Sequence, residues 1–176
     1  MVLKIASAIP IGNEEAQRDR ILLVKLDGIG DYILLERCLD RLTEKRKPLH
    51  IDIVYNHDLS QLVCKSRLFG RHHPVDLLKF RRNLVYRIRV LRALSKRSFG
   101  TVVCPMRSRN FLTTDSVIRV LDSVNKIGFV SDRSNDSMLQ NKLSNRWYTQ
   151  LLPQPEESQH EFFSLINILN QSFGPG

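Results

Sequence analysis

Residues 21–31 read Ile-Leu-Leu-Val-Lys-Leu-Asp-Gly-Ile-Gly-Asp. The apolar run at the start is typical of a strand buried on both faces, and the two glycines after it predict a tight turn. A helix is expected next, because apolar side chains recur at helical spacing at Leu35, Cys38, Leu39 and Leu42. A strand, a turn and a helix in this order form the opening unit of an open parallel α/β sheet, in which ligands bind beyond the carboxyl ends of the strands.

The same alternation continues along the chain. Short apolar runs predict further strands at Ile51–Tyr55, Val75–Phe80, Thr101–Cys104 and Lys126–Val130. Helices are predicted at Leu59–Cys64, Leu84–Lys96 and Phe162–Phe173, and also after a cap at Thr114 or Asp115, with the apolar face Val117, Ile118, Leu121 and Val124. Residues 131–159 have no clean period and are expected to be irregular. The pattern therefore predicts a Rossmann-like parallel sheet with helices on both faces.

The length of 176 residues suits a single domain, which we place at residues 20–174 after a loose N-terminal leader of residues 1–19. The chain closes with Gly-Pro-Gly, which is typical of an interdomain linker, so a second domain is expected to be missing. No apolar stretch approaches the roughly 18 residues of a spanning helix, and no transmembrane segment is predicted.

The net charge of +9 is concentrated in one part of the chain. Between Lys65 and Arg109 there are thirteen Lys and Arg residues and a single acid, Asp76. Such a surface attracts an anionic partner, either a phosphorylated saccharide, a nucleic acid or a membrane surface. A solvated helix face is the alternative interpretation of the same charges.

Neither the cysteines nor the histidines indicate a metal site. Cys38, Cys64 and Cys104 lie far apart and form no C-x-x-C pair, so we expect buried free thiols in the reducing cytoplasm. His72 and His73 have no acidic partners at ligand spacing.

The turn at Lys25–Asp31 is the most informative local motif. Its glycines allow a close backbone approach to a ligand and a positive φ. It matches neither the dinucleotide fingerprint, which needs a third glycine at position 33, nor a phosphate-binding P-loop. Asp31 is either a cap or first-turn acid of the helix, or a carboxylate at a cleft mouth that takes a proton from a hydroxyl group. Asp27 is the competing acid.

Four segments together resemble glycosyltransferase family 9, the ADP-heptose:lipopolysaccharide heptosyltransferase group. Residues 21–34 resemble the opening strand, turn and helix of the family, and residues 99–109 resemble its fourth strand with the loop that carries arginine and serine. Lys126–Phe129 resembles the fifth strand, and Trp147–Thr149 followed by His160 and Glu161 resembles the segment before the interdomain linker. The segments occur in the family's order over residues 20–174.

The resemblance implies that this chain is the N-terminal, acceptor-binding half of a two-lobed, GT-B-type glycosyltransferase. It implies that Asp31 is the general base. Because arginine forks suit phosphates and carboxylates, we expect an anionic acceptor to be bound by Arg107, Ser108 and Arg109 together with Lys25, Asp27, Gly28 and Gly30. Surface arginines in a loop are the alternative interpretation of residues 107–109. No metal or cofactor is expected in this half, because the ADP-heptose-like donor is expected on the missing lobe. The implied reaction moves a sugar of the heptose class to a lipopolysaccharide or surface-glycan acceptor, in the cytoplasm or at the inner face of the cell membrane.

The sequence departs from the family pattern at two places. The common Ser-Ser/Leu-Gly-Asp turn is Asp27-Gly28-Ile29-Gly30-Asp31 here, and the first helix has Glu36-Arg37-Cys38 in place of a Thr-Pro-Ala type stretch. Two other functions stay open: a non-catalytic fragment and a nucleic-acid-binding domain. Against the second, the basic segment has few aromatic residues and no common recognition motif.

Overall fold

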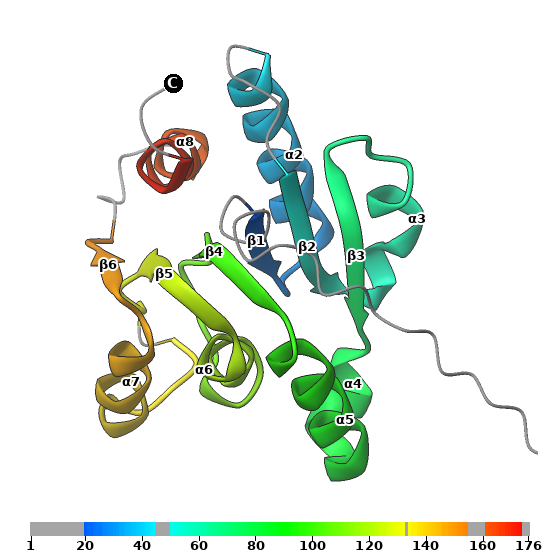
Figure 1. The fold of residues 1–176 in the computed structure, drawn as a ribbon. Coiled ribbons are helices and arrows are strands. Elements are labelled where there is room, and N and C mark those ends of the chain that lie inside the picture. Colours follow the sequence, from blue (N-terminus) through cyan, green and yellow to red (C-terminus); the bar gives the residue numbers. More distant parts are fainter. Residues whose placement is uncertain (1–19, 45–49, 133, 155–160, 174–176) are drawn as a thin grey trace, which may run out of the picture.

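A computed structural model of the chain describes residues 20–44, 50–132, 134–154 and 161–173. The predicted leader (residues 1–19), His160 and the closing Gly-Pro-Gly lie outside the described residues. Six parallel strands form one sheet in the order β3-β2-β1-β4-β5-β6 (Figure 1). They are β1 Arg20–Lys25, β2 His50–Asn56, β3 Phe69–Val75, β4 Ser98–Cys104, β5 Asp122–Phe129 and β6 Gln150–Leu152. The predicted Rossmann-like α/β fold is confirmed.

Helices cover both faces of the sheet (Figure 1). They are α2 Ile29–Thr43, α3 Ser60–Val63, α4 Leu77–Arg82, α5 Leu84–Ser95, α6 Ser116–Val120, α7 Met138–Ser144 and α8 Glu161–Phe173. Short helical turns occupy His57–Leu59, Phe111–Asp115 and Asn145–Trp147, and the second of these is a π-helical turn.

Strand β1 shows how the sequence builds two cores. Its alternate side chains Ile21 and Leu23 pack under α2, α3 and α8, whereas Leu22 and Val24 pack under α4, α5 and α6. Because β1 is buried on both faces, its sequence is a continuous apolar run rather than an alternating one.

The predicted strand at Val75–Phe80 is wrong. Strand β3 ends at Val75, and α4 begins directly after Asp76, whose carboxylate accepts a hydrogen bond of 2.9 Å from the Lys79 amide. The polar stretch before Val75 forms the strand because β3 lies at the sheet edge, where Pro74 is tolerated. The buried Asp52 carboxylate holds this edge by accepting a bond from the Arg71 amide at 2.9 Å.

The region after β4 differs from prediction in three ways. Helix α6 ends at Val120, and Val124 lies in strand β5 with 72% of its surface exposed, so it is not part of a helical apolar face. Asp115 precedes α6 but does not cap it with its side chain; instead, the Asn110 side chain caps the preceding turn by accepting a bond from the Thr113 amide at 3.1 Å. Residues 131–159 are not irregular throughout, because they include α7 and β6.

A capping box explains the start of α7. The Ser137 hydroxyl accepts a bond from the Gln140 amide, and the Gln140 side chain accepts one from the Ser137 amide. Three apolar side chains of α7, namely Met138, Leu139 and Leu143, are exposed, so the helix lacks the inward apolar stripe that periodicity detects.

Of the three cysteines, Cys38 and Cys104 are buried as expected, whereas Cys64 is exposed. None of the three forms a disulfide in the described part of the chain. Within the described ranges, no helix has the length and apolar character needed to cross a membrane.

Gly128 in β5 tests how tightly this fold is packed. A Cβ atom at this position would lie 2.7 Å from Cε1 of Tyr148, whose ring is buried and cannot move away easily. We expect Gly128→Ala to lower the free energy of unfolding by about 1–3 kcal/mol, measured by urea denaturation.

Gly30→Ala is the matched control, because its added Cβ meets nothing within 4 Å. In helix α2 alanine is favoured over glycine, so this variant should keep or slightly raise stability. Equal destabilisation by the two variants would contradict the close packing of Gly128 on Tyr148.

Candidate functional site at the carboxyl edge of the sheet

The crossover point of the sheet lies between β1 and β4. The chain runs outward from β1 to β2 and β3, and then returns to the other side of β1 with β4. In open α/β sheets, the loops on either side of such a point leave a crevice at the carboxyl ends of the strands. Here the two loops are residues 26–28 after β1 and residues 105–110 after β4.

Met106 joins these loops. Its sulfur accepts a hydrogen bond from the Leu26 amide at 3.4 Å and one from the Thr114 hydroxyl at 3.8 Å. Because Met106 is itself buried, it holds the turn after β1 against the segment that carries Arg107 and Ser108. The sequence-predicted turn and loop are therefore neighbours in the fold.

Lys25 and Asp27 form a fixed pair at the end of β1. The Lys25 side chain is 1% exposed, and its Nζ lies 2.7 Å from Oδ2 of Asp27. Burial raises the pKa of Asp27 and the neighbouring Asp31 raises it further, while the Lys25 ammonium lowers it; the net direction is upward. The role of Asp27 in this structure is to neutralise a buried lysine.

Asp31 is placed differently. It is half-buried in the first turn of α2, where a negative charge interacts favourably with the helix dipole. The N-cap position belongs to Gly28, and no side chain caps the helix. Within the described part of the chain, the Asp31 carboxylate has no hydrogen-bond or ion-pair partner, so it is not occupied as a cap.

In this structure the two glycines of the turn are required neither by backbone conformation nor by close packing. Gly28 has φ of −80°, and neither Gly28 nor Gly30 adopts the positive φ expected from the sequence. A Cβ on Gly28 would lie 3.8 Å from Oδ2 of Asp31, an ordinary van der Waals contact, so a small side chain would fit at this position. Gly30 is exposed and faces open space.

The loop after β4 carries Arg107 and Ser108 at the same edge. The half-buried Arg107 donates from Nε to the Gln154 side chain at 3.1 Å. The exposed Ser108 donates its hydroxyl to the carboxylate of Asp132 in the segment after β5. Burial raises the pKa of Asp132, but hydrogen bonds from Ser108 and Ser134 lower it, and the net direction is downward.

Arg109 does not lie with them. Its side chain is fully buried, with its guanidinium carbon 4.4 Å from the centre of the Tyr148 ring. It donates to Asn145 at 2.6 Å and to Asp115 at 3.3 Å, and the same Asp115 oxygen accepts a bond of 2.7 Å from the Tyr148 hydroxyl.

This environment keeps Arg109 charged. Burial alone would lower its pKa, but Tyr148 and Asp115 raise it, and the net direction is upward. With no exposed surface, Arg109 has no atoms available to an acceptor. It connects the loop after β4 to the core and to the turn after α7, so we assign it a positioning role.

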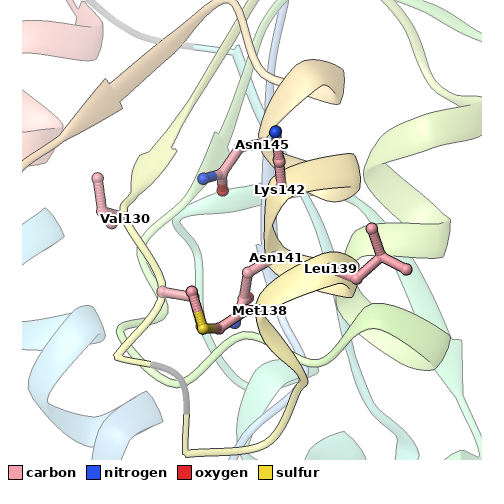
Figure 2. Close-up of a pocket in the computed structure, with 7 residues that line it drawn as sticks. Val130, Met138, Leu139, Asn141, Lys142 and Asn145 are labelled. Atoms are coloured by element: carbon pink, nitrogen blue, oxygen red, sulfur yellow. The ribbon is translucent and has the colours of Figure 1, made fainter.

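A pocket of about 470 Å³ lies next to this loop, between α7 and the segment after β5. Figure 2 shows Val130, in the segment after β5, across from α7 with Met138, Asn141 and Lys142, and Asn145 in the turn that follows α7. The remaining lining residues are Ser131 and Leu139. Arg109 is not among the lining residues, but it is connected to the pocket by its bond to Asn145.

Sequence reasoning missed this pocket because it treated the whole of residues 131–159 as irregular. The capping box at Ser137 and Gln140 was the available signal for α7. Among the described residues, no group of three or more His, Cys, Asp and Glu side chains is placed to hold a metal ion.

Known proteins were compared with the chain by sequence and by structure. No protein-family model matches the sequence, and no curated protein sequence matches it. The E. coli heptosyltransferase WaaC with ADP superimposes with a TM-score of 0.71 at 18% identity, over 89% of this chain and 48% of that one.

Two further structures give a similar result. A family 9 glycosyl transferase from Veillonella parvula has a TM-score of 0.69 at 18% identity, over 90% of this chain and 42% of that one. The E. coli ADP-heptose lps heptosyltransferase II has a TM-score of 0.62 at 12% identity, over 87% and 40%. The chain thus spans about half the length of these proteins, and it has the Rossmann-like fold found in heptosyltransferases and in a family 9 glycosyltransferase of GT-B architecture.

Proposed function

We propose that this chain is the acceptor-binding half of a glycosyltransferase that moves a sugar of the heptose class from a nucleotide-sugar donor to a lipopolysaccharide or surface-glycan acceptor. The observation that carries the proposal is the Asp31 carboxylate, which stands at the crossover point of the sheet without a cap or ion pair among the described residues. The fold shared with heptosyltransferases supports it.

In the proposed reaction, Asp31 accepts the proton of an acceptor hydroxyl as that oxygen attacks the anomeric carbon of the donor. The bond from the anomeric carbon to the nucleotide diphosphate breaks, the diphosphate leaves with the electron pair, and the configuration inverts. A carboxylate that is already partnered would first have to give up that partner, whereas Asp31 accepts the proton directly.

The other side chains of the edge have supporting roles in this proposal. Arg107 and Ser108 bind the anionic acceptor, since a guanidinium suits phosphate and carboxylate groups. Lys25 and Asp27 hold the turn in place through their buried pair. The donor is bound by a second lobe, and the reaction takes place in the cytoplasm, at the inner face of the membrane.

A transfer assay tests this proposal. The chain is mixed with ADP-heptose and a saccharide prepared from heptose-free lipopolysaccharide, alone and with the donor-binding lobe that its own or a neighbouring reading frame encodes. We expect product by mass spectrometry only when both halves are present, and acceptor binding to this chain by calorimetry without the lobe.

Two results would contradict the proposal in different ways. Acceptor binding without transfer in any assembly would make the chain a non-catalytic binding domain. Neither binding nor transfer with any nucleotide sugar in a donor screen would remove the glycosyltransferase assignment altogether.

A further inference from the structure

Helices α4 and α5 carry an exposed surface on which apolar and basic side chains are mixed. Its apolar members are Leu78, Leu84, Val85 and Ile88, which are 61%, 63%, 66% and 53% exposed. Its exposed cations are Lys79, Arg81, Arg82, Arg89, Arg92 and Lys96. Residues 77–97 contain eight Lys and Arg and no Asp or Glu. We call this surface the α4–α5 face.

The spacing on α5 puts the two kinds of side chain on one side of the helix. Leu84, Ile88, Arg92 and Lys96 follow one another at every fourth position, and Val85 and Arg89 stand in the next row. The first half of this stripe is apolar and the second half is cationic. The other side of α5 packs into the core through Leu94 and Val90, and Leu91, three residues after Ile88, is partly buried beside the stripe.

The α4–α5 face is held rigidly. Arg87, which is half-buried, donates to the carbonyl oxygens of Phe80 at 2.8 Å and Arg81 at 2.9 Å, and its guanidinium lies 5.6 Å from the centre of the Phe80 ring. These bonds fix α5 against α4, so the exposed leucines do not reflect a loosely packed helix.

Little negative charge lies nearby to balance the cations. In the part of the chain that the structure describes, the ion pair on this face is the one between Lys79 and Asp76 at 2.9 Å. Scattered single apolar residues on a surface need no explanation, but four of them on adjoining helices among unbalanced cations do.

We propose that the α4–α5 face docks on a membrane surface that contains anionic phospholipid. Its apolar side chains enter the boundary between headgroups and acyl chains, and its Lys and Arg contact the phosphates. A nucleic acid fits this face less well. Exposed leucine and isoleucine side chains make no favourable contact with phosphates, and the bases of a single strand are usually bound by aromatic stacking. Phe80 on this segment is buried, and the Tyr86 hydroxyl is engaged by the Asp76 amide.

The placement of the face suits the proposed function, and to that extent the inference rests on it. Helix α4 starts at the carboxyl end of β3, and α5 leads back towards the start of β4, so the apolar end of α5 is the end nearer the carboxyl edge. Asp31 lies at that same edge. A membrane-docked chain would thus present its site to an acceptor that is anchored in the lipid.

Vesicle flotation with the full chain tests the inference. Vesicles of phosphatidylcholine alone are compared with an equimolar mixture of phosphatidylcholine and phosphatidylglycerol. We expect binding to the mixture only, weakened by added salt. The variant Arg89→Gln/Arg92→Gln/Lys96→Gln should bind about 100-fold more weakly, since each cation near an anionic surface strengthens binding about fivefold. Val85→Ser/Ile88→Ser should lose about tenfold.

Matched controls lie outside the α4–α5 face. Arg37→Gln/Arg41→Gln removes two exposed cations from α2, and Phe163→Ser removes an apolar side chain of α8 that is 66% exposed. Both should bind the mixed vesicles like the unmodified chain. Circular dichroism checks that every variant is folded.

Three outcomes would overturn the inference. One is unchanged lipid binding in both α5 variants. Another is binding to random duplex DNA but not to vesicles, which would assign the face to nucleic acid. The third is a dimer, seen by sedimentation and lost in Val85→Ser/Ile88→Ser, without lipid binding. The assay contains no donor and no acceptor, so transfer to a water-soluble saccharide reports separately on the proposed function.

Discussion

Replacing Asp31 with asparagine is expected to lower the transfer rate about 10²–10⁴-fold, the usual contribution of a general base. The amide keeps the size and shape of the carboxylate but cannot accept the proton of the attacking hydroxyl. The fold should survive, because Asp31 caps no helix and forms no ion pair within the described residues. The measurement is the initial rate of product formation by the two-lobed assembly at saturating donor.

Asp40→Asn is the matched control, since Asp40 is an exposed acid on the same helix. It should transfer at the unmodified rate. If Asp31→Asn also retains that rate while its circular dichroism is unchanged, the base must be sought elsewhere, with Asp27 as the next acid of the turn.

Replacing Arg109 with methionine is expected to lower the free energy of unfolding by about 3–5 kcal/mol, because it leaves a buried carboxylate without its cation. Asp115 is fully buried, and one of its oxygens, Oδ2, already has no partner in the described structure. The Tyr148 ring would also lose the guanidinium packed over it. Urea denaturation followed by circular dichroism measures the change.

Arg146→Met serves as the control, because Arg146 is exposed on the neighbouring turn, and its change should stay within about 0.5 kcal/mol. If Arg109→Met does not fold, Tyr148→Phe removes only the hydroxyl bonded to Asp115 and should cost about 1–3 kcal/mol. A denaturation midpoint that neither Arg109→Met nor Tyr148→Phe shifts would show that the buried network does not stabilise the chain.

The sequence predicted the fold where burial is uniform. Strand β1 and strand β2 are apolar because both of their faces are covered, and a run of apolar residues records that directly. Strand β3 escaped prediction because an edge strand is partly solvated, so its Gly-Arg-His-His-Pro stretch carries no apolar signal. Because Leu77 and Leu78 are apolar, the strand was predicted at Val75–Phe80, most of which is helix α4.

The candidate site was predictable in part for a related reason. The position of Asp31 follows from strand, turn and helix, which are local features. The burial of Arg109 depends on Tyr148 and Asn145, which lie 39 and 36 positions away along the chain. No local sequence pattern predicts these contacts. An arginine in a loop is usually exposed, and the family pattern for residues 107–109 did not distinguish the half-buried Arg107 and the exposed Ser108 from the buried Arg109.

The contact between Met106 and the turn after β1 is a weak one. A thioether is a poor hydrogen-bond acceptor, so the bond from the Leu26 amide to its sulfur is weaker than a bond to oxygen would be. The bond therefore holds the turn with Asp27 and Gly28 next to the loop after β4, but only weakly. A small shift of the turn relative to the loop after β4 would therefore break only this weak bond between them, and the unbranched methionine side chain could follow it by changing rotamer.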